Sequence, residues 1–229
     1  MTKNKKQSLV DKAYLSMKEK ILTLEYKPGE KLEEKFLMSD IGVGRTPIRE
    51  AVRMLITEGL VKTSGTNSYY VKDLSLKTCK DLMSFLLHFG DVIFRLASVN
   101  DDFSSEVEEL EKLSKVMNHA LEKEQYLEFI KHNRQFHMTL GKIARNDYVD
   151  AVIENVYNEE MRLAFTLSKG LSSQKDHFEK LTSHHAELIE QLKKKDLESV
   201  RVAYQKHLSY GGQRLINYMF DTTFLNNND

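Results

Sequence analysis

The segment that decides the fold reads GVGRTPIREAVR and spans residues 42–53. Its glycines favour a turn at residues 42–44. We expect Thr46 to cap the helix that follows, with Pro47 at the first helical position, where its missing N–H costs nothing. The helix should extend to Glu58, and its buried face is predicted from apolar residues three or four positions apart: Ile48, Val52, Leu55 and Ile56. The segment therefore predicts an amphipathic helix that begins directly after a tight turn.

The sequence on both sides of this segment completes a small domain. Apolar residues recur with helical spacing over residues 8–24, and a short helix is predicted at 33–40. Two extended runs, 60–63 and 69–72, follow the decisive helix and are separated by turn-forming residues. Helix, short helix, turn, helix and hairpin form the order of a winged helix-turn-helix. We assign this domain, with its small β-hairpin wing, to residues 8–74.

The rest of the chain, residues 75–222, is predicted to be helical throughout. Breaks rich in Asn, Asp and Ser separate segments of about twenty residues with helical spacing. The predicted helices cover residues 75–99, 103–122, 124–144, 147–168, 174–194 and 196–219. Helices of similar length joined by short connections form antiparallel bundles. We therefore expect a mainly α protein whose second domain is an antiparallel bundle of about six helices.

The charges are unevenly divided, although 34 Lys and Arg balance 34 Asp and Glu over the whole chain. Residues 1–76 hold 14 basic and 10 acidic side chains, whereas residues 77–229 hold 20 and 24. A positive N-terminal part suits a polyanionic partner such as DNA, and chance variation is an equal alternative on this number alone.

The composition also bears on the compartment. The single cysteine, Cys79, excludes an intramolecular disulfide and fits a reducing environment. The sequence contains neither a signal-like N-terminus nor a run of eighteen apolar residues. We therefore expect a cytoplasmic protein without a membrane-spanning helix.

Two arginines near the start of the decisive helix are candidates for reading DNA. Arg45 precedes the predicted helix and Arg49 lies one turn later on the same side, away from the apolar face. Arginine matches guanine because two of its donors reach O6 and N7. A recognition helix offers its N-terminal residues to the major groove. The competing interpretation is a solvated helix face, with Arg49 and Arg53 paired to acids.

The N-terminal domain resembles the DNA-binding domain of GntR-family repressors. The resemblance is carried by KPGEKLEE at 27–34, IGVGRTPIREA at 41–51 and EGLV at 58–61. It implies that Arg45, Thr46, Arg49 and a basic residue at Lys35 contact DNA. We add Arg53, the last residue of the decisive segment, to this DNA-binding set. The Arg-Gly pair of the family's wing is replaced here by Thr66-Asn67-Ser68-Tyr69, and Gly44 replaces the usual Ser or Thr.

Three histidines of the helical domain could share an interior face. His137 follows Asn133 by four residues, so both project from one face of a helix. His185 and His207 fall on the last two predicted helices, which should pair as a hairpin. Three imidazoles and an oxygen ligand suit a divalent transition metal with open positions. On spacing alone, structural histidines at core edges or on the surface are the better supported interpretation.

The same region resembles the FCD domain, the all-helical partner of the GntR DNA-binding domain in one branch of the family. The matching segments are NRQFH at 133–137, HAELI at 185–189 and HL at 207–208. The resemblance implies that Asn133, His137, His185 and His207 hold a divalent metal, zinc or nickel, which in turn holds a carboxylate effector. Asn133 stands where the family has Asp, so this ligand carries no charge.

The resemblance also bears on the effector. The family's first bundle helix often carries an Arg and a Glu, at positions where Leu86 and Gly90 align here. An Arg there would clamp a carboxylate. Its absence and the neighbouring Phe85 and Phe89 favour a more apolar effector, with Arg162 as a substitute cation. These last three residues form the predicted effector pocket.

Together these features predict a ligand-responsive transcription regulator, most simply a repressor, and not an enzyme. Its partners would be an inverted-repeat double-stranded DNA operator, a small-molecule effector and a second copy of the chain, because one small head contacts few bases. Two alternatives are a metal-dependent hydrolase that uses the three histidines and a bundle that serves only to dimerise. The sequence offers the hydrolase neither paired carboxylates nor a nucleophile motif.

Overall fold

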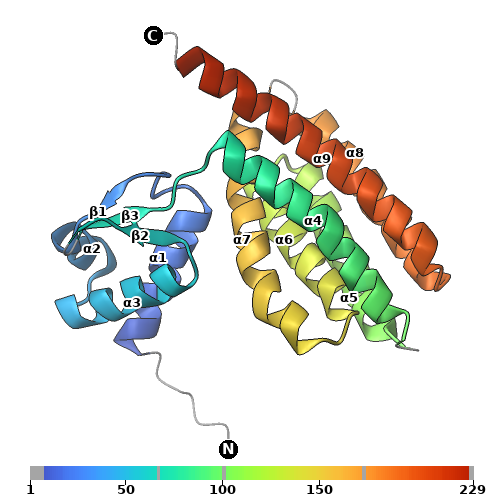
Figure 1. Cartoon of the computed structure of the whole chain (residues 1–229), viewed down its shortest axis with the longest axis horizontal. Coiled ribbons are helices and arrows are strands. Elements are labelled where there is room, and N and C mark those ends of the chain that lie inside the picture. The colour runs from blue at the N-terminus through green and yellow to red at the C-terminus, as the bar shows by residue number, and fades with distance from the viewer. Residues whose placement is uncertain (1–7, 66–67, 100–101, 172–173, 227–229) are drawn as a thin grey trace, which may run out of the picture. The chain divides into compact units, whose positions relative to one another are not determined.

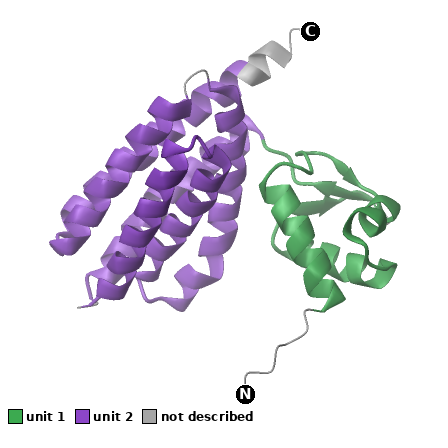
Figure 2. Ribbon diagram, turned by 180° about the vertical axis from the view of Figure 1, so that it is seen from behind, with its two compact units in different colours: residues 1–74 green, residues 75–229 purple. Residues whose placement is uncertain are grey.

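The computed structural model describes residues 8–65, 68–99, 102–171 and 174–226. The chain forms two compact units, residues 1–74 and 75–229, coloured separately in Figure 2. The predicted fold class is confirmed: a winged helix-turn-helix precedes an antiparallel helical bundle (Figure 1). No helix within the described ranges is long and apolar enough to cross a membrane.

The first unit contains three helices. They are α1 Leu9–Leu22, α2 Glu34–Ile41 and α3 Arg45–Thr57. Ser8 caps α1 and forms a capping box with Asp11, which explains the sharp start of this helix. Apolar faces of α1 and α3 pack together at the centre of the core through Ala13, Met17, Ile21, Ile48, Val52 and Leu55.

The start of α3 differs from the sequence prediction. Gly44 takes the N-cap position in an extended conformation (φ −74°, ψ 175°), and Arg45 is already the first helical residue. Thr46, expected as the cap, lies inside the first turn with its side chain exposed. Pro47 therefore occupies the third helical position, where the N–H that it lacks would also have had no helical partner. The consequence is an N-terminus with no capping side chain among the described residues.

The wing contains a strand that the sequence analysis missed. The sheet is antiparallel in the order β1-β3-β2, with bounds Lys31–Leu32, Val61–Thr63 and Tyr69–Val71 for β1, β2 and β3. The strand β1 has only two residues, too few for an alternating pattern to be detected. Thr66 and Asn67 at the predicted wing tip lie outside the described residues.

The second unit is the predicted six-helix bundle. Its helices are α4 Leu76–Ala97, α5 Ser104–Glu122, α6 Tyr126–Lys142, α7 Asp147–Gly170, α8 Gln174–Lys193 and α9 Leu197–Asn226. The helix α9 packs against α4, α7 and α8, and α5 packs against α6 and α8. The pairing of α8 with α9 agrees with the expected hairpin, whereas α9 continues seven residues past its predicted end at residue 219.

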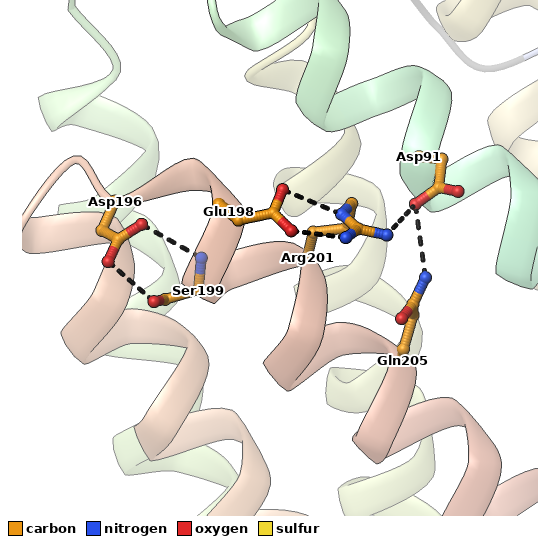
Figure 3. A network of polar contacts seen from close by, with 6 residues as sticks. All are labelled: Asp91, Asp196, Glu198, Ser199, Arg201 and Gln205. Atoms are coloured by element: carbon orange, nitrogen blue, oxygen red, sulfur yellow. Dashed lines mark hydrogen bonds and ion pairs between the residues drawn. The ribbon is translucent and has the colours of Figure 1, made fainter.

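A polar network joins α4 to α9 at the edge of their contact (Figure 3). Asp91 on α4 lies 3.6 Å from Arg201 and 3.5 Å from Gln205, both on α9. The Arg201 guanidinium also contacts Glu198 one turn earlier on its own helix. Partly exposed ion pairs of this kind contribute at most about 1 kcal/mol each. The network therefore links the two helices at their edge but adds little to their stability.

Close packing at Gly90 holds α4 against α9. A Cβ added to Gly90 would lie 2.2 Å from Cε1 of Tyr204, whose ring is buried. The Tyr204 hydroxyl hydrogen-bonds the Tyr157 hydroxyl at 2.9 Å, and the ring meets Phe94 edge-on. Because the ring is held on two sides, it cannot move to admit a larger residue, and the two helices can approach this closely only at a glycine.

We expect Gly90→Ala to lower the free energy of unfolding by about 1–2 kcal/mol. The clash with Tyr204 should cost about 1–3 kcal/mol, more than the gain of up to about 1 kcal/mol from better helix propensity. Gly211→Ala is the matched control because an added Cβ there would lie 3.9 Å from its nearest neighbour. The control should be neutral or stabilising in urea denaturation. Equal stability of the two variants would contradict this account of the helix contact.

Candidate functional site

The exposed N-terminal turn of α3 carries the candidate DNA-reading side chains. The side chains of Arg45 and Arg49 are 66% and 44% exposed, while Ile48 between them is fully buried. The helix therefore presents both guanidinium groups to solvent and its apolar face to the core, as the spacing predicted. The uncapped first turn beside them has free backbone N–H groups, an arrangement that binds phosphate.

Glu34 at the start of α2 pairs with both arginines. Its Oε1 lies 2.7 Å from Nε of Arg49, and its Oε2 lies 3.4 Å from Nε of Arg45. Both contacts use Nε, so among the described residues the terminal nitrogens of the two guanidinium groups have no partner. Those terminal nitrogens remain available for paired contacts with a guanine. Glu34 thus orients the arginines without covering them.

The other predicted DNA-binding residues are also on the surface of this unit. Lys35 on α2 and Thr46 on α3 have exposed side chains. Arg53 is 71% exposed and pairs with Glu50 at 2.5 Å. The structure therefore agrees with part of the competing interpretation, because both Arg49 and Arg53 are paired to acids.

The second unit brings His137, His185 and His207 together from α6, α8 and α9. One ring nitrogen from each lies within 4.8 Å of the other two, and the three side chains are at most 4% exposed. The Nε2 atoms of His137 and His207 are 3.1 Å apart. The ring of His137 also stacks on Tyr157. The structure thus gathers the three histidines that the sequence predicted.

The polar atoms of this cluster are short of partners. Among the described residues, Nδ1 of His137, Nδ1 of His207 and both ring nitrogens of His185 have no hydrogen-bond partner. Burial lowers the pKa of His137 to about 3 and lowers the pKa values of His185 and His207 well below 6.5. The three imidazoles are therefore neutral near pH 7, which is the form that binds a metal.

Asn133 lies one turn before His137 on α6 and is 5% exposed. Its side-chain oxygen is buried and, in the part of the chain described, has no hydrogen-bond partner. A buried unsatisfied polar group costs about 1–3 kcal/mol. A cation held by one nitrogen of each imidazole and by the amide oxygen would give these groups a partner, so the residues present fit a transition metal.

A cavity of about 50 Å³ adjoins the cluster. Asn133 and His207 belong to both the cavity wall and the cluster region. Most of the wall is apolar, from Met83, Phe129, Ile130, Ala164, Leu167, Phe178, Leu181, Leu208 and Leu215. A volume of this size holds a few water molecules, so an effector larger than a few heavy atoms requires the wall to move.

None of the residues predicted to form the effector pocket is found in this wall. Phe85 is 45% exposed on the surface of α4 and stacks on Phe89. Arg162 is fully buried and pairs with Glu159 at 3.1 Å. Phe85 and Phe89 lie on α4, the first bundle helix, and Arg162 lies on α7; the sequence could not tell which faces of these helices line the cavity.

Sequence reasoning missed two polar residues that do line the cavity, Glu160 on α7 and His177 on α8. A signal for Glu160 was present in the sequence, because it continues a heptad-like series of Ile153, Tyr157, Ala164 and Leu167. An acid within an apolar helical stripe marks a buried polar position. His177 is only 4% exposed, although nothing in its position along the chain indicated a role in the cavity.

Comparison with known proteins identifies both units. The description "Bacterial regulatory proteins, gntR family" matches residues 9–71, and the FCD domain matches residues 92–210. The chain is 25% identical over 206 residues to YdhC of Bacillus subtilis, an uncharacterised HTH-type transcriptional regulator, with 88% of each chain covered. It is 24% identical over 205 residues to the HTH-type transcriptional repressor RspR of Escherichia coli K12, covering 90% of this chain and 88% of RspR.

A solved structure supports the fold. The chain superimposes on Escherichia coli McbR/YncC with a TM-score of 0.76 at 19% identity, covering 94% of this chain and 99% of that one. The family matches place the chain among transcription regulators and set aside the hydrolase alternative. The chain is a DNA-binding regulator that belongs to the GntR family of bacterial regulatory proteins and carries an FCD effector-binding domain.

Proposed function

We propose that this regulator is a cytoplasmic repressor that binds an inverted-repeat operator as a homodimer and releases it when a small molecule enters the cavity of the second unit. The observation that carries the DNA-binding half is the exposed pair Arg45 and Arg49 at the start of α3. The cavity beside three buried histidines carries the effector half. Selection of bound DNA from a random pool, with and without added metal, tests whether one palindromic sequence is recovered.

The contacts of Glu34 support a reading role for the two arginines. A surface ion pair contributes only about 0–1 kcal/mol, so exchanging a Glu34 contact for a guanine edge costs little. Before DNA arrives, the shared carboxylate limits the freedom of two long side chains. Less conformational entropy is then lost on binding. The phosphate-binding turn at the start of α3 would set the register of the helix on the duplex.

We expect Arg45→Ala and Arg49→Ala each to weaken operator binding by about 1–3 kcal/mol, the value of a bidentate base contact. Binding to unrelated DNA should change less. Lys35→Ala should instead weaken binding to all sequences and flatten its salt dependence. Fluorescence anisotropy on selected and scrambled duplexes measures these effects, with Lys112→Ala on the second unit as the control. Unchanged operator preference in both arginine variants would refute the assignment.

The second part of the proposal is a divalent zinc or nickel ion held by His137, His185 and His207, with Asn133 as a neutral oxygen ligand. The support is the convergence of three neutral imidazoles, each with at least one unpartnered ring nitrogen, and the unpartnered amide oxygen of Asn133 one turn before His137. A bound ion would supply positive charge and an open position for an oxygen of the effector. The protein residues orient the ligands and keep them dry, because the cluster is buried.

Isothermal titration of metal-stripped protein should show one saturable site. His185→Ala should weaken metal binding by at least about tenfold, since one of three strong ligands is lost. Asn133→Asp should tighten binding because it adds a charged ligand. The exposed His88 provides a matched control, and His88→Ala should leave the affinity unchanged. No saturable binding by the native protein or by Asn133→Asp would leave the histidines as structural residues.

Burial changes the expected pH dependence of this site. For a histidine with an ordinary pKa of about 6.5, the neutral fraction that can bind the ion would fall roughly 25-fold between pH 7 and pH 5. Because the pKa of His137 is lowered to about 3, it stays neutral across that range. We therefore expect metal affinity to change little between pH 7 and pH 5, rather than to decrease as the pH drops below about 6.5. A steep loss near pH 6.5 would show that the cluster opens to solvent before it binds the ion.

The proposed homodimer is supported by an exposed apolar stripe on α4. Phe85 and Val92, seven residues apart on one helical face, are 45% and 47% exposed. Sedimentation should show a dimer, and the double variant Phe85→Asp, Val92→Asp should shift it to a monomer with weaker operator binding. Val116→Asp on α5, where Val116 is 43% exposed, is the control. A native monomer, both free and on DNA, would contradict the proposal.

A further inference from the structure

The cavity beside the histidine cluster is lined by an acid that has one buried oxygen without a hydrogen-bond partner among the described residues. This acid is Glu160, which projects from α7 into the cavity wall, and the unpartnered atom is its Oε2. Loss of solvation raises the pKa of this carboxyl group to about 7, although the nearby Arg134 acts in the opposite direction. An ionised carboxylate in this position is therefore costly while the cavity holds nothing that pairs with it.

The remaining polar groups of the wall do not supply a positive charge. They are the amide of Asn133 and the imidazoles of His177 and His207. Burial lowers the pKa of His177 to about 4, so this ring is neutral near pH 7. Within the described part of the wall there is neither Lys nor Arg. Glu160 is thus the acidic side chain of the described wall, and a cation that enters the cavity would favour its ionised form.

Arg134 does not fill this role from the cavity side. Its guanidinium donates to the Asn158 side chain at 2.8 Å and lies 3.4 Å from Glu154, both on α7. Arg134 is absent from the wall. Glu160 is also not a member of the group of ligand atoms within 4.8 Å of one another that His137, His185 and His207 form. The carboxylate therefore faces the cavity as an acceptor for whatever enters.

We propose that the effector carries a protonated amino group on an apolar body, and that the ammonium donates to Glu160 while the body packs on the apolar wall. This inference rests on the proposed function in one respect, namely that the cavity is the effector site. An ammonium satisfies a carboxylate with charge-assisted hydrogen bonds. An effector carboxylate at this end would meet like charge, and an apolar group would leave Oε2 unsatisfied.

The test uses the full-length protein stripped of metal, so that an ion at the histidine cluster does not attract a carboxylate, and three probes with the same carbon chain: n-pentylamine, pentanoate and 1-pentanol. Dissociation constants from ligand-observed NMR are compared for wild type, Glu160→Gln and the surface control Glu187→Gln. We expect wild type to bind pentylamine at least about tenfold more tightly than pentanoate, since charged hydrogen bonds contribute about 1.5–3 kcal/mol. Glu160→Gln should lose this preference and keep its affinity for pentanol, and Glu187→Gln should match wild type.

A fourth protein, Ala164→Phe, separates the inference from the proposed function by filling the cavity. Its fold is checked by circular dichroism, and we expect it to bind none of the probes. If Ala164→Phe abolishes pentanol binding but wild type shows no preference for the amine, the cavity remains the effector site and the ammonium proposal is overturned. Binding of no probe to wild type overturns both. Loss of zinc affinity in Glu160→Gln would make Glu160 a metal ligand and also overturn the ammonium proposal.

Discussion

Burial of neutral imidazoles in an apolar helical bundle is the constraint on which the second unit depends. His137, His185 and His207 come from three helices, and each loses its contact with water when α6, α8 and α9 pack. A buried polar group without a partner costs about 1–3 kcal/mol, whereas a whole domain is stable by only about 5–15 kcal/mol. Several such groups would consume much of that stability. The apolar contacts of the bundle must offset the free-energy cost of these groups. A bound ion would lower that cost by giving the buried nitrogens a partner.

The DNA-reading surface differs from the histidine cluster because its polar groups are charged and exposed to water. Its charged groups are exposed, and the contacts of Glu34 with Arg45 and Arg49 are inexpensive to exchange because water and salt screen them. Affinity there comes from a partner that is itself highly charged. The effector site must select a small molecule by a few buried contacts, so it holds polar groups in a dry wall. The two units thus use charge differently because their partners differ in size and solvation.

The sequence alone predicted the helices whose apolar residues follow a regular spacing. It did not predict the features that depend on a single contact or on local backbone geometry. Helical periodicity predicted the bundle helices to within a few residues, with the end of α9 as the largest error. The cap of α3 was misassigned because Gly44 and Thr46 both suit that position, and only backbone geometry distinguishes them. The two-residue strand β1 has no periodicity to detect. The spacing of Asn133 and His137 predicted a common face, and their convergence with the other histidines requires tertiary packing.

The effector wall was the part least accessible from sequence. Phe85 and Phe89 are adjacent on one helical face, yet Phe85 is exposed and neither is in the cavity wall. Which side of a helix faces inward depends on its neighbours, and on α4 the close contact at Gly90 with Tyr204 fixes that choice. An Arg or Glu at position 90 would not fit beside that ring. The polar function in the cavity is supplied instead from α7, through Glu160.

The position of α4 in the chain suggests how the proposed effector would act on the DNA-binding unit. Met83 lines the cavity, Phe85 and Val92 form the proposed dimer face, and the helix begins one residue after its cap, Ser75, which opens the second unit. A rigid helix cannot shift at Met83 without shifting at its ends. An effector that displaces Met83 would therefore displace α4, and contacts with Glu160 and the histidine cluster would offset the cost. An effector that binds the displaced arrangement more tightly shifts the population toward it by its difference in affinity, and no further. In a dimer joined along α4, that displacement would alter the spacing of the two DNA-binding units. This spacing must match the distance between the two half-sites of an inverted repeat.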